Sequence, residues 1–460
     1  MTEAVRVQRP RQREDDACPG ALRPHHAADG ELLRIRVPGG AIALSALRGL
    51  EAASQALADG RIGLTSRGNL QVRGVAEGDV PALVGRLRAV GLLPAAEHER
   101  VRNIIAPPLS GRRPGSRDDV DPLVHDLDAA LCARPGLALL PGRFLFAVDD
   151  GHGDVQGEGA DVLAVALGGG WYVVRPSGVG AGLRVRVENV VAAMLAVAEA
   201  FLAERVAQDS RAWRIAELVD GGGRLVERLR ASGWPREQDD PDPVPMGEAG
   251  PGQVGPGQVG RGQAGADRAG TEPGLIEQKD GRFAVCALAP LGLLNRDQVV
   301  ALIAGAELSS APADGARGAL RITPWRRIVV RDLDLPAALA VRELLSSVGL
   351  VVEPGTAWSR VTACAGRPGC AKSLTDVHAD AAAFAAVADA DGPPVHWAGC
   401  ERGCGTPVGP DVVRLLATSI EYRPDGVPQV GVAYRPDGGS LGPRDLAATG
   451  LTPTRNEIVS

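Results

Sequence analysis

Leu64-Thr-Ser-Arg-Gly-Asn-Leu-Gln-Val72 and Ile322-Thr-Pro-Trp-Arg-Arg-Ile-Val-Val330 are two strand-like runs that align with each other. The same spacing carries Gly91-Leu92 onto Gly349-Leu350. Between these landmarks both copies show an apolar helical pattern, so we predict that a strand, a helix and a returning Gly-Leu strand occur twice. The chain is therefore expected to be an internal duplication.

The duplication extends upstream of these runs. A strand and a helix are predicted at 32–37 and 46–58 in the first copy and at 283–289 and 298–305 in the second. Each unit then has about 60 residues of β-α-β-α-β character. Further strands are expected downstream in both copies, but only the second copy has cysteines at those places.

A low-complexity stretch rich in Gly and Pro separates the two copies, and its composition predicts disorder because it cannot bury a core. We expect an N-terminal segment at 1–30, a first β-α-β-α-β half-domain at 31–97, a larger α/β domain at 98–233, the disordered linker at 234–274, a second half-domain at 275–354 and an α/β domain that carries the cysteines of the second copy at 355–460.

The bulk composition describes a soluble protein and excludes some partners. The 460 residues are 45% hydrophobic with a net charge of −6, which argues against a nucleic-acid surface. Apolar stretches are too short to span a bilayer and the N-terminus lacks a signal-peptide core, so we expect no membrane segment. Unpaired cysteines in such numbers favour the cytoplasm.

Four cysteines form two close pairs, Cys364-x5-Cys370 and Cys400-x3-Cys404, in segments rich in Gly and Pro. Neither spacing is the two-residue gap usual in zinc knuckles, whereas a cubane cluster accepts varied spacings from loops. We predict a [4Fe–4S] cluster on these four residues. A structural zinc and reduced bystander thiols are the alternatives.

Two ferredoxin-like halves, each followed by a larger domain, with these cysteine pairs in the second copy, resemble the sirohaem-dependent nitrite and sulfite reductases. The resemblance implies an α+β fold, in which two ferredoxin-like half-domains are each followed by a larger α/β domain of the iron–sulfur/sirohaem type. In that family the last cysteine bridges the cluster to the sirohaem iron.

By motif position, Thr65–Arg73 is similar to the family's Thr-x-Arg-x-x-x-Gln segment, Val101–Asn103 to its asparagine–arginine segment and Pro141–Leu145 to its paired-lysine segment. The resemblance implies catalytic roles for Arg67, Arg102 and Arg143, and substrate binding by Arg67, Asn69, Gln71, Arg73, Arg102, Asn103 and Arg143. The family's two lysines are replaced by Arg143 and Leu145, so one charge and one proton source are lost.

Further segments resemble the precorrin-3B synthase family, a diverged relative of the sulfite reductases: Ala17-Cys18-Pro19-Gly20, Ala28-Asp29-Gly30, Arg34–Gly40 and Asp149-Asp150-Gly151. This resemblance implies oxygen-dependent hydroxylation of precorrin-3A at C20 with closure of a γ-lactone, in aerobic cobalamin biosynthesis. Arginines suit the many carboxylates of such a tetrapyrrole.

The implied partners are precorrin-3A, dioxygen and an external electron donor, a reductase or ferredoxin supplied from NADH. The implied cofactors are the [4Fe–4S] cluster and an additional non-haem iron, for which the motifs assign no ligands. Two other hypotheses stay open: a sirohaem-dependent sulfite or nitrite reductase, with sirohaem as a further cofactor, and a non-enzymatic iron–sulfur protein that carries or senses a tetrapyrrole.

The linker generates a first prediction. Deleting Pro235–Gly274 and rejoining the ends with a short flexible segment of sufficient reach should leave folding and activity largely intact, because a disordered segment supplies no packing. Thermal unfolding and turnover of the shortened protein measure this. A collapse of folding in that variant would mean that the segment is structured.

Overall fold

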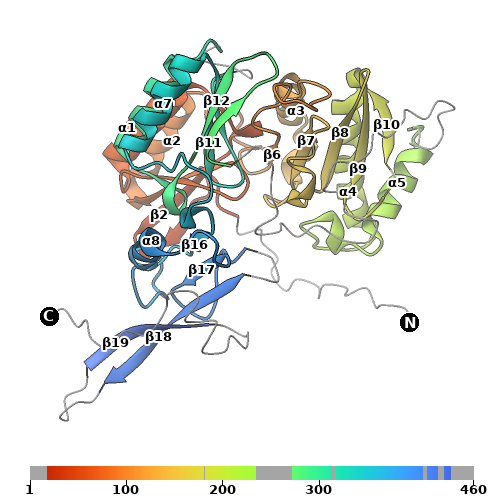
Figure 1. The fold of residues 1–460 in the computed structure, drawn as a ribbon. Helices are drawn as coiled ribbons and strands as arrows, with labels where there is room; N and C mark the ends of the chain where they lie inside the picture. Colours follow the sequence, from red (N-terminus) through yellow and green to blue (C-terminus); the bar gives the residue numbers. More distant parts are fainter. Residues whose placement is uncertain are drawn as a thin grey trace.

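The computed structural model describes residues 18–180, 182–234, 272–311, 318–407, 412–422 and 429–436. Over these residues the chain forms four β-sheets with helices packed on them (Figure 1). Two sheets belong to the ferredoxin-like halves, and the other two belong to the α/β domains that follow each half. The predicted α+β fold with its duplicated halves is confirmed.

The two ferredoxin-like sheets have matching strand orders. The first, β1-β2-β5-β4-β13, consists of His25–Ala27, Gly30–Ile35, Leu70–Val75, Ile62–Leu64 and Leu293–Leu294. The second, β11-β12-β15-β14-β3, consists of Gly274–Glu277, Phe283–Leu288, Arg327–Leu333, Leu320–Ile322 and Ala41–Ile42. Their helices are α1 (Leu44–Leu57), α2 (Val80–Ala89), α6 (Arg296–Glu307) and α7 (Leu335–Ser347).

Each of these sheets is completed by a short strand from the other half. Leu294 of β13 pairs with Ile62 of β4, and Ile42 of β3 pairs with Leu320 of β14. Buried residues of both halves form one hydrophobic core across this junction. At the entry to β3, a Cβ on Gly40 (φ +68°) would lie 1.9 Å from a backbone oxygen of the second half, so only glycine allows the approach. The halves are thus one folding unit.

The helices of the second half begin at side-chain caps. Asn295 accepts a hydrogen bond from the backbone N–H of Gln298, whose side chain accepts one from Asn295 N–H, which is a capping box. Asp334 accepts from the N–H of Ala337 at the start of α7, with Pro336 in the first turn. These caps satisfy donors that helix ends leave unpaired.

The prediction of returning strands at Gly91-Leu92 and Gly349-Leu350, after α2 and α7, is wrong. Gly91 (φ +75°) and Gly349 (φ +78°) instead end their helices in left-handed conformations. Leu92 N–H bonds to Leu87 O at 3.0 Å and Leu350 N–H to Leu345 O at 3.1 Å, the pattern of a Schellman cap. Each leucine then packs into the core as the cap's hydrophobic contact.

The two runs that reveal the duplication are hairpin tips rather than single strands. In the first copy β4 ends at Leu64 and β5 begins at Leu70. Thr65 N–H bonds to Asn69 O at 2.9 Å and closes the loop. The second copy repeats this closure from Thr323 to Arg327, also at 2.9 Å. The tip therefore projects residues 66–68 out of the sheet, where they can reach a neighbouring domain.

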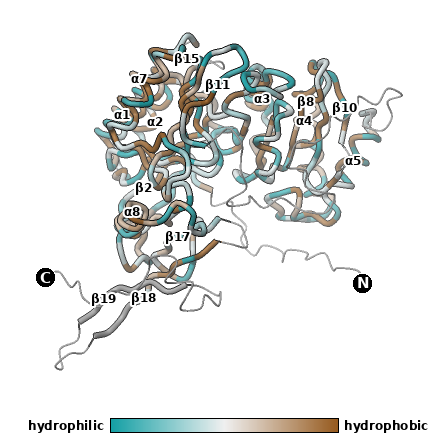
Figure 2. The backbone as a smooth tube through the Cα atoms, viewed as in Figure 1, coloured by the Kyte–Doolittle hydropathy of each residue, from teal (hydrophilic) through white to brown (hydrophobic). Residues whose placement is uncertain are grey.

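The first α/β domain has the sheet order β10-β9-β8-β7-β6, with Leu183–Arg186, Trp171–Pro176, Val162–Gly168, Phe146–Asp149 and Ile104–Ile105, and with α3 (Asp121–Cys132), α4 (Val190–Ala207) and α5 (Gly221–Ala231). Figure 2 shows hydrophobic residues along α4 and the neighbouring strands, which form this domain's core. None of the described helices combines the length and apolar character that a bilayer crossing requires.

The second α/β domain has the order β16-β17-β18-β19, with Val361–Ala363, Val395–Ala398, Val413–Tyr422 and Gln429–Pro436, and with α8 (Val377–Val387). Strands β16, β17 and β18 are parallel and β19 is antiparallel. Figure 1 shows the β18–β19 hairpin projecting away from the other domains. Residues that follow β16 and β17 therefore leave the same edge of this sheet.

The expected linker lies mostly outside the described residues, at 235–271. Its predicted end at residue 274 falls inside the second half, because Gly274 begins β11. Glu272 also belongs there, since its carboxylate pairs with Arg327 at 3.0 Å. A deletion that spares the second half should therefore stop at residue 271.

A buried ion-pair network fastens the first α/β domain to the second sheet. Asp121, at the start of α3, accepts from Arg321 at 2.9 Å and from Arg331 at 2.6 Å. Arg321 and Arg331 are 1% and 0% exposed, so neither charge can be satisfied by water. Arg112 adds a bidentate contact to Asp332 at 2.8 and 3.0 Å. One carboxylate thus binds two wholly buried guanidinium groups, and Asp332 lies 3.9 Å from the second of them, Arg331.

Asp121→Asn should lower the free energy of unfolding by about 3 kcal/mol or more, because it removes the carboxylate charge that both buried arginines bind and leaves only Asp332 near Arg331. Burial acts to raise the pKa of Asp121, but the two arginines outweigh it and hold the pKa below its usual value. The ionised form is thus stabilised on folding, and the loss should shrink as pH falls through that low pKa.

Urea denaturation from pH 7 down to pH 3 measures this, with Asp126→Asn on the exposed face of the same helix as the control. If Asp121→Asn and Asp126→Asn unfolded at the same urea concentration at pH 7, the network would not stabilise the fold.

Candidate functional site

The hairpin tip of the first copy is held against the first α/β domain by two buried asparagines. Asn69 accepts from Val37 N–H at 2.9 Å and donates to Asn103 Oδ1 at 3.2 Å. Asn103 in turn donates to Gly142 O at 2.9 Å and to Phe144 O at 3.3 Å. Both amides, predicted to bind substrate, therefore join the three segments that carry the predicted arginines.

Arg67 and Arg143 lie near each other at this junction. Arg67 projects from the tip, and its Nη1 donates to Gly142 O at 3.5 Å. Arg143 is exposed, with its guanidinium 5.7 Å from the ring centre of Trp213. Burial lowers the pKa of Arg67 to about 10, and repulsion from Arg214 and Arg143 adds to this shift.

Two further arginines, Arg34 and Arg36, belong to the same site. They occupy the outer face of β2 and its end, opposite the core-facing Leu33 and Ile35, and Arg34 pairs with Gln71 of β5 across the sheet. The alternation in Leu33-Arg34-Ile35-Arg36-Val37 was a signal for this face that the motif comparison missed. We call Arg34, Arg36, Arg67 and Arg143 the arginine cluster.

The arginine cluster carries buried charge without matching acids. No carboxylate among the described residues lies within salt-bridge distance of Arg34, Arg36 or Arg67. Arg34 Nε and Arg36 Nη1 are buried and have no hydrogen-bond partner. Burial, followed by repulsion from Arg34, lowers the pKa of Arg36 to about 9. Arg36 also donates to Arg100 O at 3.2 Å and to Pro19 O at 3.4 Å, while Glu99 attracts Arg36 and Asp161 attracts Arg67 from beyond salt-bridge distance. Guanidinium groups that lack a directly bound carboxylate are suited to an anionic ligand with several carboxylates.

The equivalent face of the second copy is apolar. The strand registers place Cys286 and Val329 where the first copy has Arg34 and Gln71. Cys286 and Val329 are fully buried against Leu109 from the first α/β domain. Burial also raises the pKa of the Cys286 thiol to about 12, as expected of a thiol in an apolar core. The duplicated faces have diverged into a cationic face and a sealed apolar one.

Two other predicted arginines are held in ion pairs. Arg102 is 5% exposed and makes a bidentate contact with Asp128 of α3, at 2.7 and 2.6 Å. Arg73 makes a bidentate contact with Asp29, at 3.1 Å to each oxygen, and its Nη2 also donates to Gly369 O at 2.7 Å. Arg73 thus joins the first sheet to the loop between Cys364 and Cys370. Substrate binding by these two residues stays a prediction.

Leu145, the residue that stands in place of a family lysine, packs in a small apolar cluster with Ile105, Ala147 and Val155. Its backbone N–H donates to Asp161 at 2.9 Å, and Asp161 also pairs with Arg214 at 2.6 Å. The apolar side chain is therefore buried beside the segment that carries Arg143.

The cysteine pairs lie at one edge of the fourth sheet. Cys364 follows β16 and Cys400 follows β17, and these strands are parallel neighbours. Cys364 Sγ accepts from Gly399 N–H at 3.3 Å, so the two loops touch. Burial raises the pKa of the Cys364 thiol; N–H donors from Gly399 and Gly366 oppose this, while Cys370 and Cys400 nearby add to it. Three of the four predicted ligands are thus neighbours.

Cys404 is exposed, and its carbonyl oxygen accepts from His396 Nε2 at 3.2 Å. Within the part of the chain that the structure describes, no three His, Cys, Asp or Glu side chains are arranged to hold one metal ion as they stand. The chemistry of the donor set nevertheless fits a cluster, because two neighbouring loops supply four thiols and backbone N–H groups of Gly399 and Gly366 donate to the sulfur of Cys364. Ligation by all four stays a prediction.

Further cysteines and histidines of the first copy have different surroundings. Cys18 is partly buried and interacts electrostatically with Arg34, Arg36 and Arg67, which places it at the arginine cluster. His25 and His26 are exposed on the short strand β1. Cys132 is half-buried at the end of α3.

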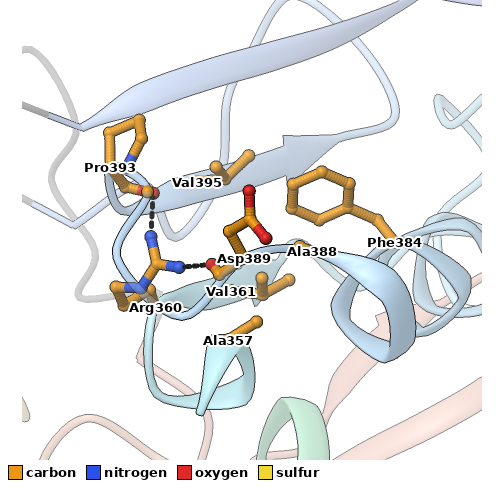
Figure 3. Close-up of a pocket in the computed structure, with 9 residues that line it drawn as sticks. Ala357, Arg360, Val361, Phe384, Ala388, Asp389, Pro393 and Val395 are labelled. Carbon is orange, nitrogen blue, oxygen red and sulfur yellow. Dashed lines mark hydrogen bonds between the residues drawn. The ribbon is translucent and has the colours of Figure 1, made fainter. Parts of the chain in front are cut away.

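A small cavity beside the fourth sheet is not a substrate site. Figure 3 shows Arg360 at its edge, donating to Pro393 O at 3.0 Å and to Asp389 O, with Phe384 and Val395 in the wall. Its volume of about 20 Å³ has room for about one water molecule. A tetrapyrrole could not enter it.

Comparison with known proteins agrees with this architecture. Residues 23–90 match the nitrite/sulfite reductase ferredoxin-like half domain. The NirA protein of Mycobacterium tuberculosis has a similar structure, with a TM-score of 0.65 over 88% of this chain and 74% of that one, at 19% identity. The fold is nitrite/sulfite reductase-like. The resemblance to that superfamily, predicted from the hairpin and cysteine motifs, is confirmed.

Two relatives match almost the whole nitrite/sulfite reductase-like chain. A precorrin-3B synthase from a Sinorhizobium species is 26% identical over 420 residues, covering 88% of this chain and 81% of the relative. A ferredoxin–nitrite reductase from Synechococcus elongatus is 25% identical over 431 residues, covering 87% and 78%. Both are enzymes, which supports the prediction that this chain is one.

The arginine cluster generates a prediction on ligand binding. Arg34→Met should weaken binding of uroporphyrin III, a tetrapyrrole with acetate and propionate arms, by roughly tenfold or more, because a charge-assisted contact is lost. The unliganded protein should be equally stable or about 1 kcal/mol more stable, because burial lowers the pKa of Arg34 and so disfavours its charged form in the folded state.

Fluorescence titration and thermal unfolding measure the two effects, with Arg88→Met on the exposed face of α2 as the control. A variant at Arg34 that binds the porphyrin as wild type does, or that loses stability, would contradict a ligand-binding role.

Proposed function

We propose that the chain is a precorrin-3B synthase, which hydroxylates precorrin-3A at C20 with dioxygen and closes a γ-lactone in aerobic cobalamin biosynthesis. The observation that carries the proposal is the arginine cluster, in which Arg34, Arg36 and Arg67 are partly or wholly buried cations with no carboxylate within salt-bridge distance. A substrate with many acetate and propionate arms matches that demand. The whole-chain similarity to a precorrin-3B synthase supports it.

In this proposal the residues of the first copy bind and orient the tetrapyrrole. Arg34, Arg36 and Arg67 hold carboxylate arms by charge-assisted hydrogen bonds. Asn69 and Asn103 keep the tip carrying Arg67 in contact with the segment carrying Arg143. Leu145 and its apolar neighbours keep water from that side, which favours neutral dioxygen over a small oxyanion.

The second copy holds the electron-transfer group. A [4Fe–4S] cluster, when bound by Cys364, Cys370, Cys400 and Cys404, supplies single electrons from an external donor. Arg73 anchors the first of these loops to the sheet that carries Arg34, so the cysteines and the arginine cluster keep a fixed spacing. Overall, one oxygen atom enters the substrate and the other leaves as water, with two electrons and two protons from the donor and solvent. The same proposal includes a cytoplasmic location.

The similarity to a nitrite reductase keeps a second candidate, a sirohaem-dependent nitrite or sulfite reductase. That reaction delivers several protons to a small oxyanion and benefits from cationic proton donors. Leu145 is neither charged nor a proton donor, and it is buried. The absence of a proton donor at this position favours oxygenation over oxyanion reduction. A non-enzymatic carrier would catalyse neither reaction.

The deciding experiment is anaerobic purification followed by iron, sulfide and visible-spectrum analysis, then assays with precorrin-3A and reductant with and without dioxygen. We expect iron and sulfide, no sirohaem bands, and turnover of precorrin-3A only with dioxygen. Sirohaem in stoichiometric amount, rapid reduction of sulfite or nitrite and no turnover of precorrin-3A would together establish the second candidate instead.

Cys370→Ser should abolish both the broad cluster absorbance and turnover, because it removes one of the four thiolates. Cys132→Ser, at a half-buried cysteine in the first copy, is the matched control and should retain both. Full iron and sulfide in Cys370→Ser would mean that the ligand set is wrong.

A further inference from the structure

A row of polar side chains crosses the fourth sheet on the face away from α8. Thr362 of β16 and His396 of β17 are direct neighbours in register, and Arg414 of β18 continues the row. The alternate residues of β16 and β17 pack with α8 in the domain core. His396 is nevertheless 0% exposed, so the opposite face is covered too. A buried histidine in such a place needs partners for both ring nitrogens.

Both partners are present. His396 Nε2 lies 3.2 Å from Cys404 O, and Nδ1 lies 2.9 Å from Thr362 Oγ1. A carbonyl oxygen can only accept, so Nε2 carries the hydrogen. In the neutral ring with the hydrogen on Nε2, Nδ1 is an acceptor and takes the hydrogen bond of the threonine hydroxyl. The hydrogen bonds thus run in one direction from Thr362 through His396 to Cys404.

The Cys-x3-Cys loop lies directly on this row. Gly403 has φ +54°, and a Cβ there would lie 2.6 Å from Arg414 Nη1. A Cβ on Gly405 would lie 3.7 Å from His396 Cε1. Gly403 N–H also bonds to Cys400 O at 3.2 Å and closes the turn. The loop backbone is therefore seated on the sheet by contacts on either side of Cys404.

We infer that His396 and Thr362 are positioning residues that hold the backbone of Cys404 in place for cluster binding. Cys404 needs such support more than the other three cysteines, because it is the exposed one. The histidine acts through the backbone of Cys404 and touches no reacting atom. The inference relies on the proposed function only for the cluster, since the hydrogen bonds exist in the protein itself.

The first test uses metal-free protein and hydrogen exchange of a peptide spanning residues 399–407. His396→Phe keeps a buried ring without hydrogen bonds and should speed exchange of this segment at least tenfold. Thr362→Val, which keeps the shape of the side chain, should act in the same direction with a smaller effect. Thr362→Ser, which keeps the hydroxyl, should stay near wild type. His125→Phe, on the exposed face of α3, is the control.

The second test measures release of iron to a chelator from the reconstituted protein, together with the midpoint potential of the cluster. His396→Phe should lose iron at least fivefold faster than wild type and shift the potential. His396→Gln, whose amide can still donate to Cys404 O, should recover part of the difference. A merely structural histidine would change the melting temperature without these effects.

The two tests separate the inference from the proposed function. Unchanged exchange at 399–407 in both His396→Phe and Thr362→Val would overturn the positioning role, whatever cofactor the protein binds. The opposite result combines faster exchange in both variants with a wild-type protein that takes up no iron and sulfide. It would support the positioning of Cys404 as a property of the loop and would contradict the cluster in the proposed function.

Discussion

Each ferredoxin-like sheet is completed by a strand that the other half supplies, and the rest of the architecture depends on this exchange. Strands β3 and β13 have only two residues each, yet they place both halves around one core. A short strand contributes little by itself, so the pairing is stable only because that core is shared. The two α/β domains then pack against a single rigid body, with Asp121 and Arg73 as their fastenings.

The two copies differ most on the faces of their sheets, one of which is cationic and the other apolar. Arg331 and Arg73 occupy equivalent positions in the two copies. Each binds a carboxylate, Asp121 or Asp29, and each also donates to a backbone oxygen of a neighbouring domain. The nearby positions differ: the second copy is filled by apolar side chains, whereas the first carries arginines without acids. The ion pairs of Arg331 and Arg73 stabilise the fold, whereas the arginines without a directly bound acid lower its stability.

The sequence predicted the duplication and the α+β fold, because repeats are local properties of the chain. It also predicted that four cysteines converge, and three of them are neighbours in the structure, while ligation by all four stays a prediction. It did not predict the exchange of β3 and β13, since nothing in a two-residue strand marks its partner. The Gly91-Leu92 and Gly349-Leu350 pairs were wrong as strands because a glycine at a helix end serves as a cap. Arg102 and Arg73 bear motif positions, but only three-dimensional contacts reveal Asp128 and Gly369 as their partners.

The exchanged strands β3 and β13 are relevant to how the duplicated chain evolved. Two identical chains that exchanged such strands would form a closed dimer with a two-fold axis, and every feature of one face would be repeated on the other. Covalent fusion removes that requirement, because each face then mutates independently. Trp325 stands where Arg67 stands in the first copy, which a symmetric dimer could not achieve. An asymmetric macrocycle needs one binding face, and a fused pair can provide it.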